Sequence, residues 1–306
     1  MPMALEQLAP IRAALLARRA ALPPPLAARR AGFEAQMAAL SLPAEMQART
    51  VALSPTQDGL IVRLPESAAD RMILWVHGGA FVLGSPASYR DFAIRLCRAS
   101  GCPVLLPDYR LAPEHIFPAA RDDVLAALDW LEGNGLPMSQ VAIGGDSAGA
   151  NLALAAVQVR LFEGRPVPVA CHFVSPYLDL THSGKSIAMR ADRDPFVDPA
   201  GMAATAATYA GEAPVEDARV SPLFGAVKGL PRVLIQVGAD EVLFDDAWRL
   251  AQRIWTEGGN ALFQEWVGMI HVWPLFAASV DEGQWAIAQA GAFLKSALLG
   301  DSPAAV

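Results

Sequence analysis

Hydrophobic residues along the chain follow two different periods, which divide it into a short N-terminal part and a longer alternating part. In residues 1–45, apolar side chains recur at helical spacing with arginines on the opposite faces, which predicts two amphipathic helices separated by Pro23–Pro25. From Val51 onward, short apolar runs alternate with longer helical patterns. This alternation predicts an α/β fold with a mostly parallel central sheet and helices on both faces.

The boundaries of the alternating elements follow from the same pattern. The candidate strands are the apolar runs at 59–64, 72–76, 104–106, 141–143, 169–174, 233–237 and 262–267. The candidate helices are 87–99, 119–131, 148–161, 245–257 and 283–298. A further helix is predicted near 199–210, because Asp198 and Pro199 are typical of a helix start and Gly211 of a helix end.

The long gap between the strands ending at 174 and starting at 233 interrupts the alternation. A chain of 306 residues favours one large domain with an insertion over two full domains. We therefore expect residues 46–176 and 221–300 to form one α/β domain. Residues 1–45 and 177–220 would then form a helical cap, or lid, over the carboxyl edge of the sheet.

Composition restricts the partners and the compartment. Net charge is -7, which argues against nucleic acid as a partner, and 53% of the residues are hydrophobic, enough for a core on both faces of a sheet. The three cysteines form no C-x-x-C pair, and an odd number suits a reducing compartment. No apolar run reaches the ~18 residues of a membrane span, and the first residues lack the features of a signal peptide. We therefore expect a cytoplasmic protein without a membrane span.

One glycine-rich segment, Gly145-Asp146-Ser147-Ala148-Gly149, joins a candidate strand to a candidate helix. It has the G-x-S-x-G form of a nucleophile elbow, in which a serine hydroxyl is exposed on a strained strand-to-helix turn. At so sharp a turn the two backbones nearly touch, so the glycines that flank Ser147 must lack a Cβ. The alternative is an ordinary glycine-rich connection with an unreactive serine, and the strand–helix context favours the elbow.

A serine nucleophile needs hydrogen-bond donors for the oxyanion that its attack creates. The run His77-Gly78-Gly79-Ala80-Phe81 follows the candidate strand 72–76 and is of the H-G-G-G type that supplies such donors, with Ala80 in place of the last glycine. We predict an oxyanion hole made by the backbone N–H groups of Gly78, Gly79 and Ala148. His77 itself is interpreted as structural, with its ring bonded to nearby backbone.

The nucleophile also needs a base and an acid that orients the base, and elbow hydrolases carry them in the order Ser, Asp or Glu, His. His271 is the histidine that lies in a loop after the last candidate strand, so it is the predicted base. Asp240, in the loop after the strand at 233–237, is the predicted orienting acid. Glu241 and the pair Asp245 and Asp246 are the alternatives, although that pair also suits the N-terminal end of the following helix.

With these residues in view, the chain resembles the hormone-sensitive-lipase-like family of bacterial carboxylesterases, which has the α/β-hydrolase fold. The resemblance rests on H-G-G-A-F at 77–81, P-D-Y-R-L-A-P-E at 107–114, G-D-S-A-G at 145–149, G-A-D-E-V-L at 238–243 and I-H-V-W at 270–273. The segment 175–181 is also similar to the branch that contains monoterpene lactone hydrolases. The resemblance implies an esterase for short to medium acyl chains without cofactor or metal, with an N-terminal cap and often a dimer along the last strand. It also implies that the segment 109–114 braces the oxyanion loop.

The leading hypothesis is a serine carboxylester hydrolase in which Ser147, His271 and Asp240 form the triad and the substrate is a small ester. The same machinery could cleave lactones or amides. A non-catalytic receptor, as in the plant gibberellin receptors that have lost the histidine, is disfavoured because His271 is present. A nucleotide-binding protein is disfavoured because the glycine-rich segment is neither G-x-G-x-x-G nor followed by G-K-[ST].

Overall fold

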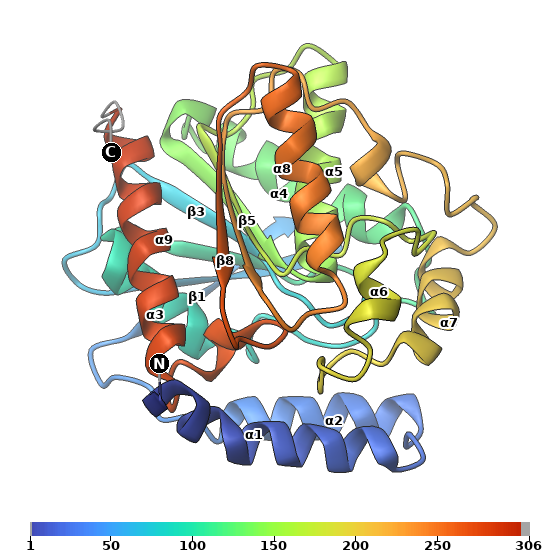
Figure 1. Ribbon diagram of the computed structural model, residues 1–306. Helices are drawn as coiled ribbons and strands as arrows, with labels where there is room; N and C mark the ends of the chain where they lie inside the picture. Colours follow the sequence, from blue (N-terminus) through green and yellow to red (C-terminus); the bar gives the residue numbers. More distant parts are fainter. Residues whose placement is uncertain (1, 301–306) are drawn as a thin grey trace.

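In the computed structural model, which describes residues 2–300, eight strands form one sheet in the order β1-β2-β4-β3-β5-β6-β7-β8 (Figure 1). Neighbouring strands from β4 to β8 are parallel, whereas β2 runs antiparallel to β1 and β4. The strands are β1 (Gln47–Ser54), β2 (Gln57–Arg63), β3 (Met72–Val76), β4 (Val104–Pro107), β5 (Val141–Asp146), β6 (Ala170–Val174), β7 (Arg232–Gly238) and β8 (Ala261–Trp266). The prediction of a mostly parallel α/β sheet is confirmed.

The helices lie close to the predicted ranges. The α-helices are α1 (Pro2–Ala20), α2 (Leu26–Ala38), α3 (Arg90–Ser100), α4 (Ala119–Gly133), α5 (Ala148–Phe162), α6 (Ser186–Met189), α7 (Pro199–Ala210), α8 (Phe244–Thr256) and α9 (Asp281–Leu299). Short 3-10 helices are η1 (Met138–Gln140), η2 (Pro222–Phe224) and η3 (Trp273–Phe276). The predicted end signals of α7 are confirmed, because the Asp198 side chain accepts a hydrogen bond from Ala200 N–H and Gly211 ends the helix.

The sequence pattern did not predict β1. Its first four residues are exposed and Val51 is the first buried one, so the apolar alternation that marks a strand is missing from half of its length. The strand exists because its backbone pairs with β2 from Gln47 to Ser54.

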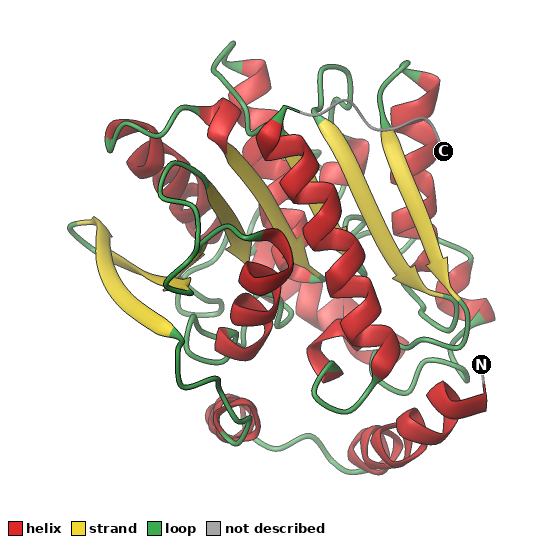
Figure 2. Cartoon of the chain, turned by 90° about the vertical axis from the view of Figure 1, so that its left-hand side faces the viewer, coloured by secondary structure: helices red, strands yellow, loops and turns green. Residues whose placement is uncertain are grey.

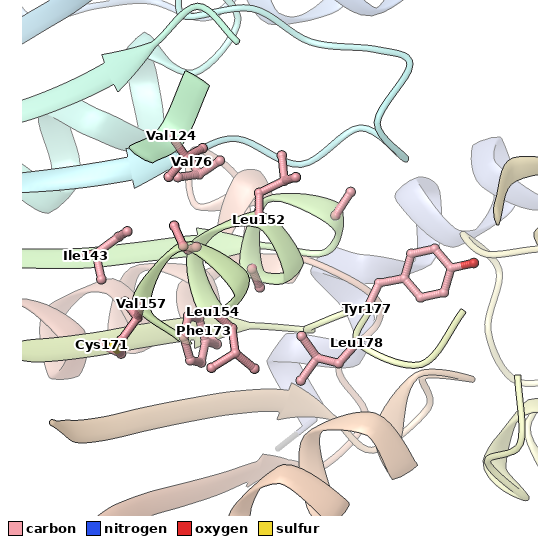
Figure 3. Packing of buried hydrophobic residues seen from close by; sticks show 14 of the residues in the cluster. Val76, Val124, Ile143, Leu152, Leu154, Val157, Cys171, Phe173, Tyr177 and Leu178 are labelled. Carbon is pink, nitrogen blue, oxygen red and sulfur yellow. The ribbon is translucent and has the colours of Figure 1, made fainter. Parts of the chain in front are cut away.

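Helices cover both faces of the sheet, and each face has its own hydrophobic core. Successive residues of β3 point to opposite sides, so that Leu74 belongs to the core that also contains residues of α4, α5 and α8, while Ile73 and Trp75 belong to the core that contains residues of α3 and α9. Figure 3 shows the first core, where Leu152, Leu154 and Val157 of α5 lie against residues of β5 and β6. Since α5 is buried on nearly all sides, its sequence is mostly apolar rather than amphipathic.

The N-terminal helices lie along one side of the sheet domain, near α6 and α7 in Figure 1 and at the bottom of Figure 2. Leu8 of α1 is fully buried in the core that contains α9. Arg19 of α1 donates hydrogen bonds to the carbonyls of Ala191 and Asp194 in the predicted lid segment. These contacts join the two stretches of the proposed cap, and the domain division itself stays a prediction.

None of the helices between residues 2 and 300 has the length and apolar character needed to cross a membrane.

Candidate active site

Ser147 lies on the sharp turn between β5 and α5, with φ 52° and ψ -121°, in a region of backbone space that L-residues rarely occupy. The turn requires its two glycines for steric reasons. A Cβ on Gly145 would lie 2.5 Å from the carbonyl carbon of Gly149, and a Cβ on Gly149 would lie 2.0 Å from the carbonyl oxygen of Val76. The steric reason inferred from the G-x-S-x-G spacing is therefore confirmed. The Ser147 side chain projects from a position that is 9% exposed.

Two buried side chains continue from Ser147 in a hydrogen-bonded chain. The Nε2 atom of His271 lies 3.0 Å from Ser147 Oγ, and its Nδ1 atom lies 2.9 Å from Glu241 Oε2. Elements far apart in the sequence supply the three groups: the β5–α5 turn, the loop after β7 and the loop after β8. A hydroxyl, an imidazole and a carboxylate in this order form the arrangement that activates a serine nucleophile.

The structure contradicts the prediction that Asp240 is the acid. Its carboxylate pairs with Arg12 of α1 at 2.9 Å and with Arg193 of the lid segment, whose Nε lies 3.0 Å away. In the turn after β7, Glu241 N–H donates to Gly238 O, and the side chains of Asp240 and Glu241 lie in different surroundings. Asp240 forms ion pairs with arginines of the predicted cap, whereas the longer side chain of Glu241 contacts His271.

Glu241 is fully buried, and all of its polar contacts orient it toward His271. Its Oε1 atom accepts hydrogen bonds from Gly238 N–H and from the Ser175 hydroxyl, the latter at 2.7 Å. The same hydroxyl accepts from Val272 N–H at 3.0 Å, so Ser175 ties the acid to the residue next to His271. Sequence reasoning missed Ser175, and its position directly after β6 is the signal that could have found it.

Burial and charge act in opposite directions on the imidazole. Burial lowers the pKa of His271, but the hydrogen bond to Glu241 and the charge of that carboxylate outweigh it, so that the pKa lies above its ordinary value. The charges of Asp194 and Asp146 act in the same direction. Burial also raises the pKa of Glu241, against the effect of its hydrogen bond to His271.

The structure also contradicts the choice of Gly78 as an oxyanion donor. Its N–H is already engaged by Asp146 Oδ1 at 3.1 Å and by the Tyr89 hydroxyl oxygen at 3.0 Å. The Tyr89 hydroxyl in turn donates to Asp146 Oδ2 at 2.7 Å. Gly78 is glycine for another reason, because a Cβ there would lie 2.3 Å from the Asp146 carboxylate.

Asp146, inside the elbow motif, is thus a buried anchor for the start of the oxyanion loop. It also accepts a hydrogen bond from Trp75 Nε1. Burial raises the pKa of Asp146 to about 6, although the hydrogen bond from Tyr89 acts against that shift. The sequence pattern assigned no role to Asp146 or to Tyr89.

Within the described range 2–300, the backbone N–H groups of Gly79, Ala80 and Ala148 donate no hydrogen bond to another residue. Ala148 is the first residue of α5, where helix geometry leaves the N–H without an internal acceptor. Gly79 and Ala80 have φ values of 119° and 56°, so the loop backbone turns sharply at this point. Free N–H groups at a helix start and a glycine turn are the usual donors for an oxyanion.

The other sequence candidates have structural contacts. His77 Nδ1 bonds to the Gly78 carbonyl at 2.8 Å and its ring stacks on Tyr109, which confirms its structural interpretation. Asp245 and Asp246 lie in the first turn of α8, as their position in the sequence predicted, but neither side chain caps the helix. Instead Asp245 accepts from Ser186 N–H, and Asp246 accepts from the N–H groups of residues 178 and 179.

The predicted lid segment contacts the hydrogen-bonded chain at His271. The ring of Phe196 meets the His271 ring edge to face, with 5.3 Å between centroids. Asp194, fully buried, accepts from the N–H groups of Phe196 and of Val242, the residue after Glu241. This segment therefore covers the histidine and is tied to the acid loop.

Comparisons with known proteins agree with this geometry. A family model described as alpha/beta hydrolase fold matches residues 73–275. An acetyl-hydrolase of Streptomyces hygroscopicus is 41% identical over 233 residues, 76% of this chain and 78% of that protein. An esterase of Acinetobacter venetianus is 34% identical over 76% of this chain and 77% of its own. The crystal structure of an esterase from the bacterial hormone-sensitive lipase family has a TM-score of 0.92 and 34% identity, covering 96% of this chain and 98% of that one.

The chain therefore belongs to the α/β-hydrolase family, and within it to the esterases similar to hormone-sensitive lipase. It is a carboxylic ester hydrolase. The likeness to monoterpene lactone hydrolases, the dimer and the cytoplasmic location stay predictions.

Proposed function

We propose that this enzyme hydrolyses esters of short to medium acyl chains through an acyl-enzyme intermediate on Ser147. The observation that carries the proposal is the hydrogen-bonded chain from Ser147 through His271 to Glu241. His271 takes the hydroxyl proton as Ser147 Oγ attacks the ester carbonyl, and then gives it to the departing alcohol. Water attacks the acyl-enzyme in the second half of the reaction, with His271 again as the base. No step needs a cofactor or a metal.

In this proposal the orienting acid is Glu241, and the oxyanion donors are the N–H groups of Gly79, Ala80 and Ala148. Glu241 fits the role because its carboxylate fixes Nδ1 as the protonated nitrogen and leaves Nε2 free to accept the serine proton. The three N–H groups fit because they lack acceptors in the described part of the chain. In the transition state the carbonyl oxygen of the substrate becomes negatively charged and accepts hydrogen bonds from these N–H groups.

The preference for short acyl groups is supported by the relative named an acetyl-hydrolase, to which the chain is 41% identical. It is also supported by the cover that Phe196 provides over the histidine. An apolar wall close to the reacting atoms restricts the length of the acyl group that fits.

The function is tested with purified enzyme on p-nitrophenyl esters from acetate to palmitate and on a γ-lactone. The p-nitroanilide that carries the acyl group of the fastest ester is tested as well. We expect kcat/KM to be highest at two to six acyl carbons, and the anilide to be about 10³-fold poorer or worse, a barrier difference near 4 kcal/mol. Equal turnover of anilide and ester would replace the esterase by an amidase, and faster lactone opening would favour the lactonase alternative. Failure to turn over any of these compounds would contradict the proposal and favour a receptor.

We expect the acidic limb of the kcat/KM profile to lie above pH 6.5, the unperturbed pKa of histidine. Only the neutral imidazole of His271 accepts the serine proton, and Glu241 raises the pKa of His271, so activity is lost as pH falls through that raised value. In Glu241→Gln the limb of the residual activity should move to lower pH, because burial then acts without the carboxylate. In Asp240→Asn it should stay in place. A limb that does not move in Glu241→Gln would contradict the assignment of the acid.

A further inference from the structure

Arg30 of α2 connects two loops of the catalytic domain through one guanidinium group. Its Nε donates to the carbonyl of Val82 at 2.8 Å, and its Nη2 donates to the carbonyl of Ala112 at 2.9 Å. Nη1 and Nη2 also form a bidentate ion pair with Oε1 and Oε2 of Glu114, at 2.8 Å each. The side chain is 29% exposed, so it lies at the surface and is not part of a packed core.

The first of these loops is the one that carries the proposed oxyanion donors. Ala80 and Phe81 have positive φ values of 56° and 63°, which are unfavourable for an L-residue. Such a conformation persists only where the surroundings impose it. Val82, whose carbonyl Arg30 holds, is the next residue along the chain.

The second loop, which contains Ala112, contacts the oxyanion loop at Phe81, the residue before Val82. Ala112 N–H donates to the Phe81 carbonyl at 3.0 Å, while Arg30 bridges the carbonyls of the neighbouring Val82 and of Ala112 itself. One helical turn further along α2, Glu34 accepts a hydrogen bond from the Ser85 hydroxyl at 2.9 Å. The same face of α2 thus contacts the oxyanion loop twice.

We propose that Arg30 is a positioning residue for catalysis: by holding Val82 O and Ala112 O, it keeps the backbone at Gly79 and Ala80 in the orientation that binds the oxyanion. The proposal rests on the function proposed above. The planar guanidinium of Arg30 donates to four acceptor atoms at fixed angles, which a lysine ammonium cannot reproduce. The N-terminal helices are then part of the catalytic machinery as well as a cover.

The test compares Arg30→Ala and Arg30→Lys with the wild type on p-nitrophenyl acetate, a substrate with a short acyl group. Removing one oxyanion donor outright costs about 10²–10³ in kcat, so a displaced loop should cost about tenfold or more, mainly in kcat. Arg30→Lys should lie between Arg30→Ala and the wild type. Glu114→Gln should cost less than Arg30→Ala, because it leaves the bond to Val82 O in place.

The matched control is Arg29→Ala, which removes the neighbouring arginine of the same helix. Burial and the nearby Arg18 lower the pKa of Arg29, and within residues 2–300 its side chain donates no hydrogen bond to the oxyanion loop, unlike that of Arg30. This variant should keep kcat within about twofold of the wild type, because a substitution away from the hydrogen-bonded contacts of Arg30 changes little else.

A second readout separates positioning from simple loss of stability. A trifluoromethyl ketone forms a bond between Ser147 Oγ and its carbonyl carbon, the serine proton passes to His271, and the resulting oxyanion occupies the hole. Across the variants, its inhibition constant should rise by the same factor by which kcat/KM falls, at a temperature well below all unfolding midpoints. If both Arg30 variants have wild-type kcat and inhibition constants, or if Arg29→Ala loses as much, the role of Arg30 is overturned. An inactive wild type would instead overturn the proposed function.

Discussion

Replacing Ser147 with alanine is expected to lower kcat for ester hydrolysis by about 10⁶-fold, the loss seen when a serine protease loses its nucleophile. The Ser147 side chain makes its hydrogen bond to His271, and the strained backbone of the turn is held by neighbouring residues. The fold should therefore persist, with an unfolding midpoint close to that of the wild type. Initial rates on a p-nitrophenyl ester and thermal unfolding by circular dichroism measure the two quantities.

The same assignment predicts where a serine-directed organophosphate reacts. One equivalent should add to the wild type and none to Ser147→Ala, with peptide mapping placing the adduct on Ser147. Buried serines such as Ser175 and Ser221 should stay unmodified, because neither lies beside the histidine Nε2. An adduct on another serine, or residual activity above about 1% in Ser147→Ala, would show that the nucleophile has been misidentified.

Replacing Glu241 with glutamine is expected to lower kcat by about 10⁴-fold, as the corresponding Asp-to-Asn change does in a serine protease. The amide has nearly the shape of the carboxylate, but it can present an N–H to Nδ1 and so favour the wrong tautomer of His271. It also leaves the imidazolium that forms in the transition state without its negative partner, in a site where both side chains are buried.

The matched control for this change is Asp240→Asn, one residue earlier. Asp240 pairs with Arg12 and Arg193, whose side chains are 26% and 55% exposed, and such exposed pairs contribute about 1 kcal/mol or less. We therefore expect a loss in kcat of less than about tenfold and a small fall in the unfolding midpoint. If Asp240→Asn were the more damaging change, the assignment of Glu241 would be wrong.

The sequence by itself determined the architecture and two members of the proposed catalytic chain. Apolar runs of strand length alternating with helical patterns predict a parallel sheet because burial on both faces leaves no other arrangement for them. Ser147 could be identified because the elbow motif is short: a Cβ on Gly145 would meet the backbone of Gly149, four residues later in the same turn. His271 followed from chain order, as the histidine in a loop after the last strand.

Only the tertiary structure decided which carboxylate and which amides serve the site. Asp240 and Glu241 are adjacent and both acidic, and the choice between them depends on arginines of the cap that are 228 and 47 residues away from Asp240 in the chain. Gly78 and Gly79 are likewise adjacent, and the choice depends on Asp146 and Tyr89, which occupy the N–H of Gly78. The direction of each side chain depends on the φ and ψ angles of its residue, and partners distant in the sequence influence those angles. The local sequence pattern therefore does not predict which of two adjacent residues faces the site.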